Sequence, residues 1–207
     1  MSPRCDHWHQ VWTGRDPASV SWYQREPTRS LELIAGAGVG VDDGIVDVGG
    51  GASMLTVRLA DGGYRDLTVV DIARPALDLL DASLAAARAG HHAVRLVCTD
   101  VLDWQPDRRF ALWHDRAVNH FLTDLGERRS YAALAARSVA PGGHVVLASF
   151  APDGPAQCSG LPVHTCEPDA LAAELGPAFD LVSVTRELHD TPWHAKQSFH
   201  YLLLRRR

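Results

Sequence analysis

The chain has 207 residues, which is enough for one domain with a sizeable core and too few for two comfortable ones. A formal net charge of -5 argues against general nucleic-acid binding, which favours a basic surface. No apolar run approaches the roughly 20 residues of a membrane span, no signal segment opens the sequence, and the four cysteines show no regular spacing. We therefore expect a cytoplasmic protein with free thiols and neither a nucleic-acid nor a membrane partner.

The first forty residues differ in character from the rest of the chain. They are rich in Trp, with polar and turn-forming residues between. From residue 41 onward the sequence alternates between strand-like and helix-like stretches. We expect one domain over 1–207, with 1–40 as an N-terminal segment attached to a core at 41–207.

The core is expected to alternate strands with helices. The predicted strands are 44–48, 66–72, 93–100, 110–115, 144–150, 179–188 and 197–206, and the predicted helices are 52–63, 74–90, 126–143 and 167–176. This alternation predicts an α/β fold with a doubly wound, mostly parallel, seven-stranded sheet. No helix separates the last two strands, so the last strand is expected to run antiparallel.

The glycine loop in "GIVDVGGGAS", residues 44–53, follows the first strand. In a doubly wound sheet, ligands bind at the carboxyl ends of the strands, and glycines let a ligand touch the backbone there. A dinucleotide fingerprint needs a third glycine where this chain has Met54, and a pyrophosphate gains nothing from Asp47 just before the loop. A nicotinamide-dependent oxidoreductase is therefore disfavoured, and no Gly-Lys-Ser/Thr follows to make a phosphate loop.

Acids end the next two strands as well. Asp71 lies about twenty residues after the loop, where a carboxylate can accept both hydroxyls of a ribose. Asp100 ends the third strand, where it could meet an adenine amino group. An acid at one strand end most often caps a turn, but three acids in register with a glycine loop favour a nucleoside with a cationic portion, which Asp47 would attract.

The segments "VDVGGGAS", "VVDIA" and "CTDVLDW" resemble the successive cofactor motifs of class I S-adenosylmethionine (SAM)-dependent methyltransferases. The stretches "FALWHDRAVNHF" and "APGGHVVLASF" are similar to the later strands of that family, so the resemblance covers roughly 30–205. It implies a Rossmann-like methyltransferase fold and SAM as cofactor. The resemblance places Asp47 and the loop of Gly49, Gly50 and Gly51 around the methionine portion, Asp71 at the ribose, and Asp100 with Val101 at the adenine. Ser53 and Ile72 complete the expected cofactor-binding residues.

The stretch "LWHDRAVNHF" is expected to face the methyl acceptor, because in the family this strand end faces the methyl donor. A neighbouring base would help an oxygen or ammonium acceptor to lose a proton, whereas a thiol needs less assistance. His114, Asp115 and His120 are the candidate catalytic residues, and Arg116 and Asn119 are expected near the acceptor. The alternative is that Asp115 and Arg116 form a structural ion pair and that His114 points away.

The segment "SWYQ" resembles the N-terminal lid of small-molecule methyltransferases, which makes Trp22 and Tyr23 candidate lid residues over the sulfonium. Simple packing of these aromatic side chains onto the domain edge is equally compatible with the pattern. The loops at 151–166 and 189–199 are expected to rim the pocket. Neither the segment 5–9 nor the loop containing Cys158, His164 and Cys166 is expected to bind a metal.

The sequence favours a SAM-dependent methyltransferase that acts on a small molecule with a thiol, oxygen or nitrogen nucleophile. Two alternatives stay open: a protein-lysine methyltransferase, which would need an open acidic groove, and a SAM-binding domain that acts only through partners. The intact acids argue against the second alternative. The oligomeric state is not determined by these patterns.

Overall fold

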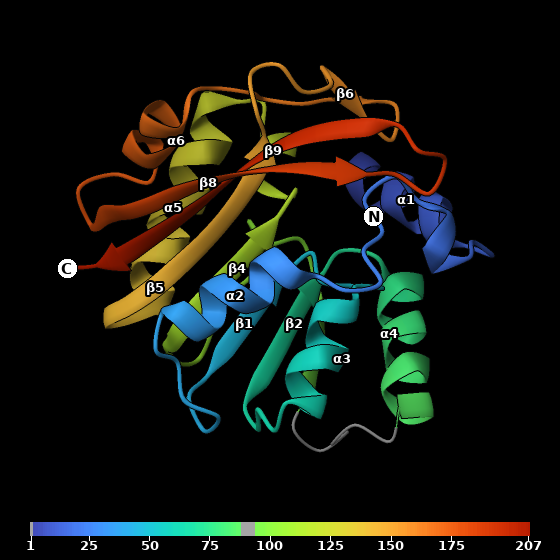
Figure 1. Cartoon of the computed structure of the whole chain (residues 1–207), viewed down its shortest axis with the longest axis horizontal. Helices are drawn as coiled ribbons and strands as arrows, with labels where there is room; N and C mark the ends of the chain where they lie inside the picture. The colour runs from blue at the N-terminus through green and yellow to red at the C-terminus, as the bar shows by residue number, and fades with distance from the viewer. Residues whose placement is uncertain (1, 88–93) are drawn as a thin grey trace.

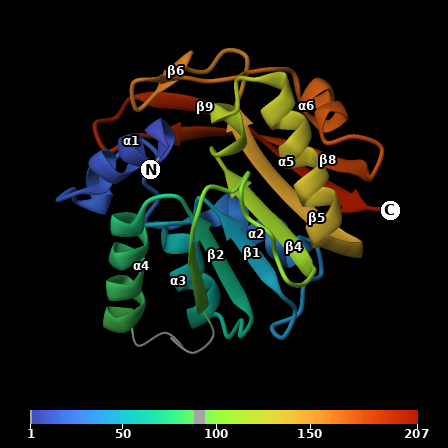
Figure 2. The same ribbon diagram turned by 180° about the vertical axis from the view of Figure 1, so that it is seen from behind.

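The computed structural model describes residues 2–87 and 94–207, and its sheet is covered by helices on both faces. Helices α2, α3 and α4 cover one face in Figure 1, and α5 and α6 cover the other in Figure 2. The helices are α1 (Pro3–Trp12), α2 (Thr28–Gly36), α3 (Met54–Asp61), α4 (Arg74–Ala87), α5 (Leu125–Ser138) and α6 (Pro168–Glu174), with short 3-10 turns η1 (Pro17–Ser19) and η3 (Asn119–Phe121).

Seven strands form the central sheet in the order β3-β2-β1-β4-β5-β9-β8. They are β1 (Ile45–Val48), β2 (Leu67–Asp71), β3 (Val94–Cys98), β4 (Phe110–Arg116), β5 (Val139–Phe150), β8 (Phe179–Asp190) and β9 (Lys196–Arg206). β9 pairs antiparallel with both β5 and β8, and the other pairings are parallel. The doubly wound seven-stranded sheet with an antiparallel last strand, expected from the sequence, is thus confirmed.

Three local features differ from the sequence-based expectation. Residues 3–12 form a helix, with Pro3 in its first turn and the Ser2 hydroxyl capping its start. β5 begins at Val139, because this residue already pairs with Phe110, so α5 ends before the Pro-Gly-Gly segment. The loop at 151–166 contains a two-stranded hairpin, β6 (Gln157–Cys158) and β7 (Leu161–Pro162). The predicted end of the helix at 74–90 lies outside the described residues.

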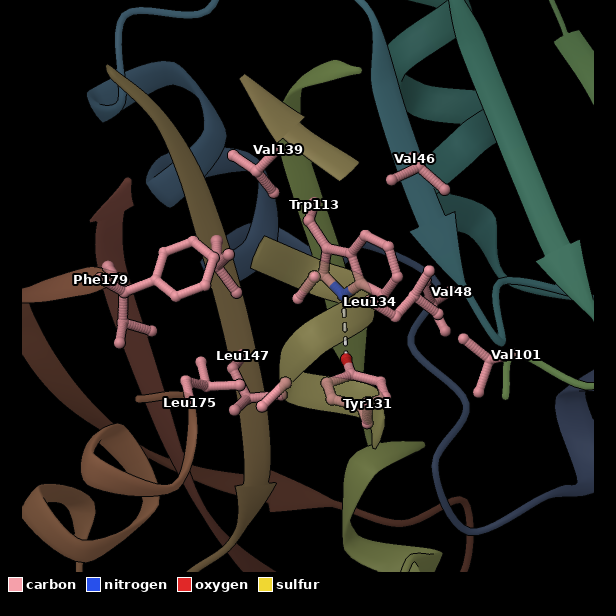
Figure 3. Close-up of a cluster of buried hydrophobic side chains, with 14 of the residues drawn as sticks. Val46, Val48, Val101, Trp113, Tyr131, Leu134, Val139, Leu147, Leu175 and Phe179 are labelled. Atoms are coloured by element: carbon pink, nitrogen blue, oxygen red, sulfur yellow. Dashed lines mark hydrogen bonds between the residues drawn. The ribbon is translucent and has the colours of Figure 1, made fainter. Parts of the chain in front are cut away.

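Strand β4 divides its side chains between the two faces of the sheet, as the period of two requires. Trp113 packs on the α5 side, where its indole Nε1 donates a hydrogen bond of 2.9 Å to the Tyr131 hydroxyl (Figure 3). That hydroxyl donates in turn to Asp115, at 2.5 Å. His114 and Arg116 lie on the opposite side, beneath α2 and the N-terminal segment. This alternation decides which residues of β4 can reach the site.

No described helix is both long and apolar enough to cross a membrane.

Candidate active site

The glycine loop packs so tightly that side chains would not fit it. Gly49 has a φ of +66°, and a Cβ there would collide with the Val118 side chain. A Cβ on Gly50 would collide with the Asp47 carboxylate, and one on Gly51 would lie 2.6 Å from an oxygen of Asp71. The loop is therefore a bare-backbone cradle against the acids that end β1 and β2.

Asp71 ends β2 with its carboxylate next to this cradle. One oxygen accepts a hydrogen bond from the Gly51 amide at 3.0 Å, and the other accepts from the Ala73 amide at 2.8 Å. Burial raises the pKa of Asp71 to about 6. Each oxygen keeps a lone pair, so the carboxylate can accept hydroxyl groups from a ligand in the adjoining cavity.

Asp100 follows β3 at the same edge of the sheet. One of its oxygens accepts from the Leu102 amide at 3.0 Å, and the other accepts from the Arg4 guanidinium at 3.2 Å. Arg4 also donates to Glu127 at 2.7 and 2.8 Å, so α1 is tied across the cavity to α5. Ile72 and Val101 provide apolar surface beside these acids.

Asp47 and His114 form a buried pair at the other end of the glycine loop. The Nδ1 atom of His114 donates to Asp47 at 2.8 Å, which leaves Nε2 to accept from the Ser30 hydroxyl at 2.8 Å when the ring is neutral. Asp47 also accepts from Thr56 at 3.3 Å. Ser53 caps the start of α3 through the Leu55 amide. Both nitrogens of the His114 ring are therefore used in fixing Asp47 and α2.

Two adjoining cavities meet at Gly49 and Arg116, residues that line both. The first is open to solvent, and the empty space inside it measures about 800 Å³. It is lined by Asp71, Ile72, Asp100 and Val101 from the predicted cofactor set, and by Arg4, Trp8, Trp12, Trp22, Phe121, Leu122 and Cys158. The second is lined by Asp47, Gly50, Ser53, Met54, Ser30, His114, Trp22 and Tyr23, among others.

Four aromatic side chains border the first cavity opposite the strand ends and form an aromatic wall, namely Trp8, Trp12, Trp22 and Phe121. The ring of Trp8 meets Phe121 edge-on at 5.0 Å between centroids and Trp22 at 6.1 Å, and Trp12 meets Trp22 at 5.9 Å. Figure 1 shows α1 at the end of the sheet, beside the start of α4. Trp8 and Trp12 were not singled out from the sequence, although their spacing of four residues places them on one side of a helix.

Asp115 and Asn119 lie beneath this wall rather than in it. Asp115 is fully buried, and its carboxylate accepts from the Tyr131 hydroxyl and from the amides of Val118 and Asn119 at 2.8 and 3.0 Å. Asn119 is 3 % exposed and lines neither cavity. Both residues shape the turn after β4, and neither faces the space for an acceptor.

His120 is also removed from the cavities. Its ring is completely buried against Phe121 and Phe150, with centroid separations of 4.4 and 4.8 Å. Burial, with the nearby Arg116 charge, lowers the pKa of His120 to about 3. Neither ring nitrogen has a hydrogen-bond partner among the described residues. The position of His120 thus differs from the acceptor-facing place expected from the sequence, because the short η3 turn directs it into the core.

The loops expected at the rim contribute unequally. Cys158 from 151–166 lines the first cavity, whereas no residue of 189–199 lines either one. His164, Cys166 and Glu174 each place one donor atom within 4.8 Å of the others. Glu174 is already paired with His164 at 3.0 Å and with Arg128 at 3.2 Å, so we treat this cluster as an ion-pair network.

Comparison with known proteins shows a domain and a fold that this chain resembles. Residues 45–143 match the family model described as a methyltransferase domain. A search of curated proteins gives no match. Among solved structures, the N-methyltransferase NodS from Bradyrhizobium japonicum WM9, in complex with S-adenosylhomocysteine (SAH), is 21% identical with a TM-score of 0.71, covering 97% of this chain and 99% of that one.

Two further structures share the fold. One, described by the conversion of a disulfide bond into a thioacetal group during echinomycin biosynthesis, has a TM-score of 0.77 at 18% identity, covering 98% of this chain and 93% of the other. The other is the 1,6-didemethyltoxoflavin-N1-methyltransferase of Burkholderia thailandensis with bound 1,6-didemethyltoxoflavin and SAH, with a TM-score of 0.69 at 22% identity, covering 97% and 83%. Residues 45–143 thus match a methyltransferase domain, and the chain as a whole shares the Rossmann-like fold of these solved methyltransferases.

Proposed function

We propose that this methyltransferase acts on a small molecule, which binds in the first cavity between the strand ends and α1. The observation that carries the proposal is the composition of that cavity. The nucleoside-facing acids Asp71 and Asp100 share it with the aromatic wall of Trp8, Trp12, Trp22 and Phe121. One chamber therefore has a polar side for the cofactor and an apolar side for an acceptor.

In this proposal the chain's residues bind and orient the two reactants. Asp71 accepts the ribose hydroxyls, Asp100 with Val101 and Ile72 holds the adenine, and the glycine loop with Asp47 and Ser53 lies against the methionine portion. When bound, SAM supplies an electrophilic methyl group on a cationic sulfur. The aromatic wall excludes water and attracts that positive charge through the ring faces.

The lysine-methylation alternative is less well supported by these side chains. A lysine acceptor is a cation and would favour an acidic approach to the methyl group. The acids of the first cavity are Asp71 and Asp100, both assigned to the nucleoside, and Arg4 and Arg116 add positive charge to the same cavity. A purely non-catalytic role would not require space for an acceptor beside the cofactor, and the aromatic side of the first cavity offers such space.

A direct test uses the purified protein with methyl-labelled SAM. We expect SAH to bind and NAD not to bind in calorimetry, and we expect label to pass to at least one member of a panel of thiols, phenols, amines and carboxylic acids. Transfer of label to proteins in a cell extract, with none to any small acceptor, would favour the lysine alternative. Tight NAD binding without any response to SAH would contradict the proposal.

A further inference from the structure

Arg116 is a cation at the site without an anionic partner. Its Nε donates to the Tyr201 hydroxyl at 2.9 Å, its Nη1 donates to the Trp22 carbonyl at 2.9 Å, and its guanidinium lies 4.6 Å from the centre of the Phe199 ring. Its Nη2 is shielded from solvent and has no hydrogen-bond partner in the described part of the chain. No carboxylate of residues 2–87 and 94–207 forms an ion pair with it.

Arg116 acts on titratable groups that are neutral near pH 7, and the Glu187 carboxylate, which acts on the same Tyr201 hydroxyl, accepts a hydrogen bond from the Gln24 amide at 2.8 Å. The charge of Arg116 contributes to the lowered pKa values of His120 and His189 and acts to lower those of Tyr201 and Cys158, against the larger upward effect of burial. The acid next to it in sequence, Asp115, points to the other face of the sheet and is saturated with donors. The shielded Nη2 atom of a guanidinium costs free energy unless an acceptor compensates it, and none of the described residues supplies one.

Among the described residues that line the first cavity, none is a free base suited to neutral pH. The ionisable residues of this lining are Arg4, Asp71, Asp100, Cys158 and Arg116. Arg4 and Asp100 pair with each other, Asp71 is assigned to the ribose, and burial raises the pKa of Cys158 to about 11. His114 and His120 both lie outside this lining. An acceptor that arrives already ionised would need no proton removal by the enzyme.

We propose that the acceptor is a flat organic acid whose anionic group binds Arg116 while its ring packs against Trp8, Trp22 and Phe121. This inference rests on the proposed function and specifies its substrate class. In the transfer, a lone pair on the acceptor forms a bond to the methyl carbon as the carbon–sulfur bond breaks and its electrons pass to sulfur. If the anionic oxygen is itself the nucleophile, the neutral product no longer pairs with Arg116, which favours its release.

The cofactor's own carboxylate is the competing partner for Arg116, because this residue lines both cavities. The methionine portion has other donors near its expected place, namely the hydroxyl of Ser53, the phenol of Tyr23 and the amide of Gln24 along the second cavity. The acceptor side of the first cavity has only Arg116 as an unpaired cation among the described lining residues. We therefore assign Arg116 to the acceptor.

The test measures binding of flat acids to the SAH-loaded protein by calorimetry. The probes are benzoate, 2-naphthoate and indole-3-carboxylate, each compared with its primary amide. We expect at least one acid to bind tenfold or more tightly than its amide, since a charge-assisted hydrogen bond contributes on that scale. Arg116→Gln should abolish this preference and change SAH affinity less than twofold, and Arg116→Lys should retain part of it.

Arg206→Gln is the matched control. Arg206 also stacks on an aromatic ring, Phe179, and donates to the carbonyls of Ala136 and Ala178, but it lines neither cavity. It should keep the acid preference. The inference is overturned if no acid is preferred over its amide, or if the preference survives in Arg116→Gln. It is also overturned if that variant weakens SAH tenfold while decarboxylated SAH binds as before, which would assign Arg116 to the cofactor. Failure of wild type to bind SAH would instead contradict the proposed function.

Discussion

Strand β2 ends in a buried aspartate, Asp71, and β4 carries one as its penultimate residue, Asp115, yet the two carboxylates face different surroundings. Asp71 accepts from two amides and lines the cavity, whereas Asp115 accepts from two amides and a phenol and lines no cavity. Burial raises the pKa of each to about 6. The comparison teaches that a raised pKa does not by itself mark a binding residue. An acid near a strand end can accept hydrogen bonds from a ligand only where its free lone pairs face empty space.

The largest expected effect is a loss of folding stability when Asp115 is replaced. Asp115→Ala leaves the Tyr131 hydroxyl and the amides of Val118 and Asn119 unpaired in the core, so the free energy of unfolding should fall by about 3 kcal/mol or more. Urea denaturation measures the loss. Asp115→Asn retains an acceptor oxygen and should lose less. An Asp115→Ala protein of normal stability that merely turns over slowly would restore Asp115 as a catalytic candidate.

The second prediction concerns the cofactor. Asp71→Ala removes the acceptor of two ribose hydrogen bonds, each worth about 1.5–3 kcal/mol to a charged group, so SAH affinity should fall at least tenfold. Calorimetry measures the affinity, and circular dichroism checks that the variant is folded. Asp115→Asn serves as the matched acid, which should keep its SAH affinity. Equal losses in both variants would remove the distinction between the two strand ends.

The pH dependence of SAH binding sharpens the same comparison. Because the pKa of Asp71 is raised to about 6, its carboxylate is ionised above that pH and becomes protonated as the pH falls through it. Only the ionised form accepts two ribose hydroxyls freely, so affinity should be about tenfold weaker at pH 5 than at pH 7.5. In Asp71→Asn this dependence should disappear, and in Asp115→Asn it should persist. A pH profile that is flat in wild type would contradict the assignment.

The smallest expected effect tests the N-terminal segment as a lid, which stays a prediction. Arg4 is partly exposed, so its ion pairs with Asp100 and Glu127 contribute little stability, about 1 kcal/mol or less. Arg4→Gln should raise the SAH dissociation rate about two- to fivefold, since α1 is then released more often. Stopped-flow displacement measures the rate.

Limited proteolysis gives an independent check of the lid. Trypsin should cut at Arg15 or Arg25 in the free protein and more slowly with SAH present. An exposed arginine elsewhere, Arg65, provides a site whose cleavage should not depend on the ligand. Equal cleavage near Arg15 and Arg25 with and without SAH would make Trp22 and Tyr23 ordinary packing residues.

Much of the cofactor half of the site could be predicted from the sequence. The glycine loop and the acids at 47, 71 and 100 each lie at the carboxyl end of a strand or just after it, and parallel strands bring these ends to one edge. Local pattern was enough here, because every element involved is short, regular and bounded by turn residues. The antiparallel last strand followed in the same way from the missing crossover helix.

The acceptor half depended on contacts between residues distant in sequence. The roles of His114, Asp115 and Arg116 differ because successive side chains of β4 meet α2, α5 and the N-terminal segment in turn, partners that lie 84, 16 and 94 residues away. The sequence by itself determined the elements, the glycine cradle and the acids along one edge of the sheet. Only the tertiary structure decided that α1 covers that edge with Trp8 and Trp12 and that Arg116 lies there without a counter-ion among the described residues. Partnerships over such separations are fixed by the packing of whole elements and not by local pattern.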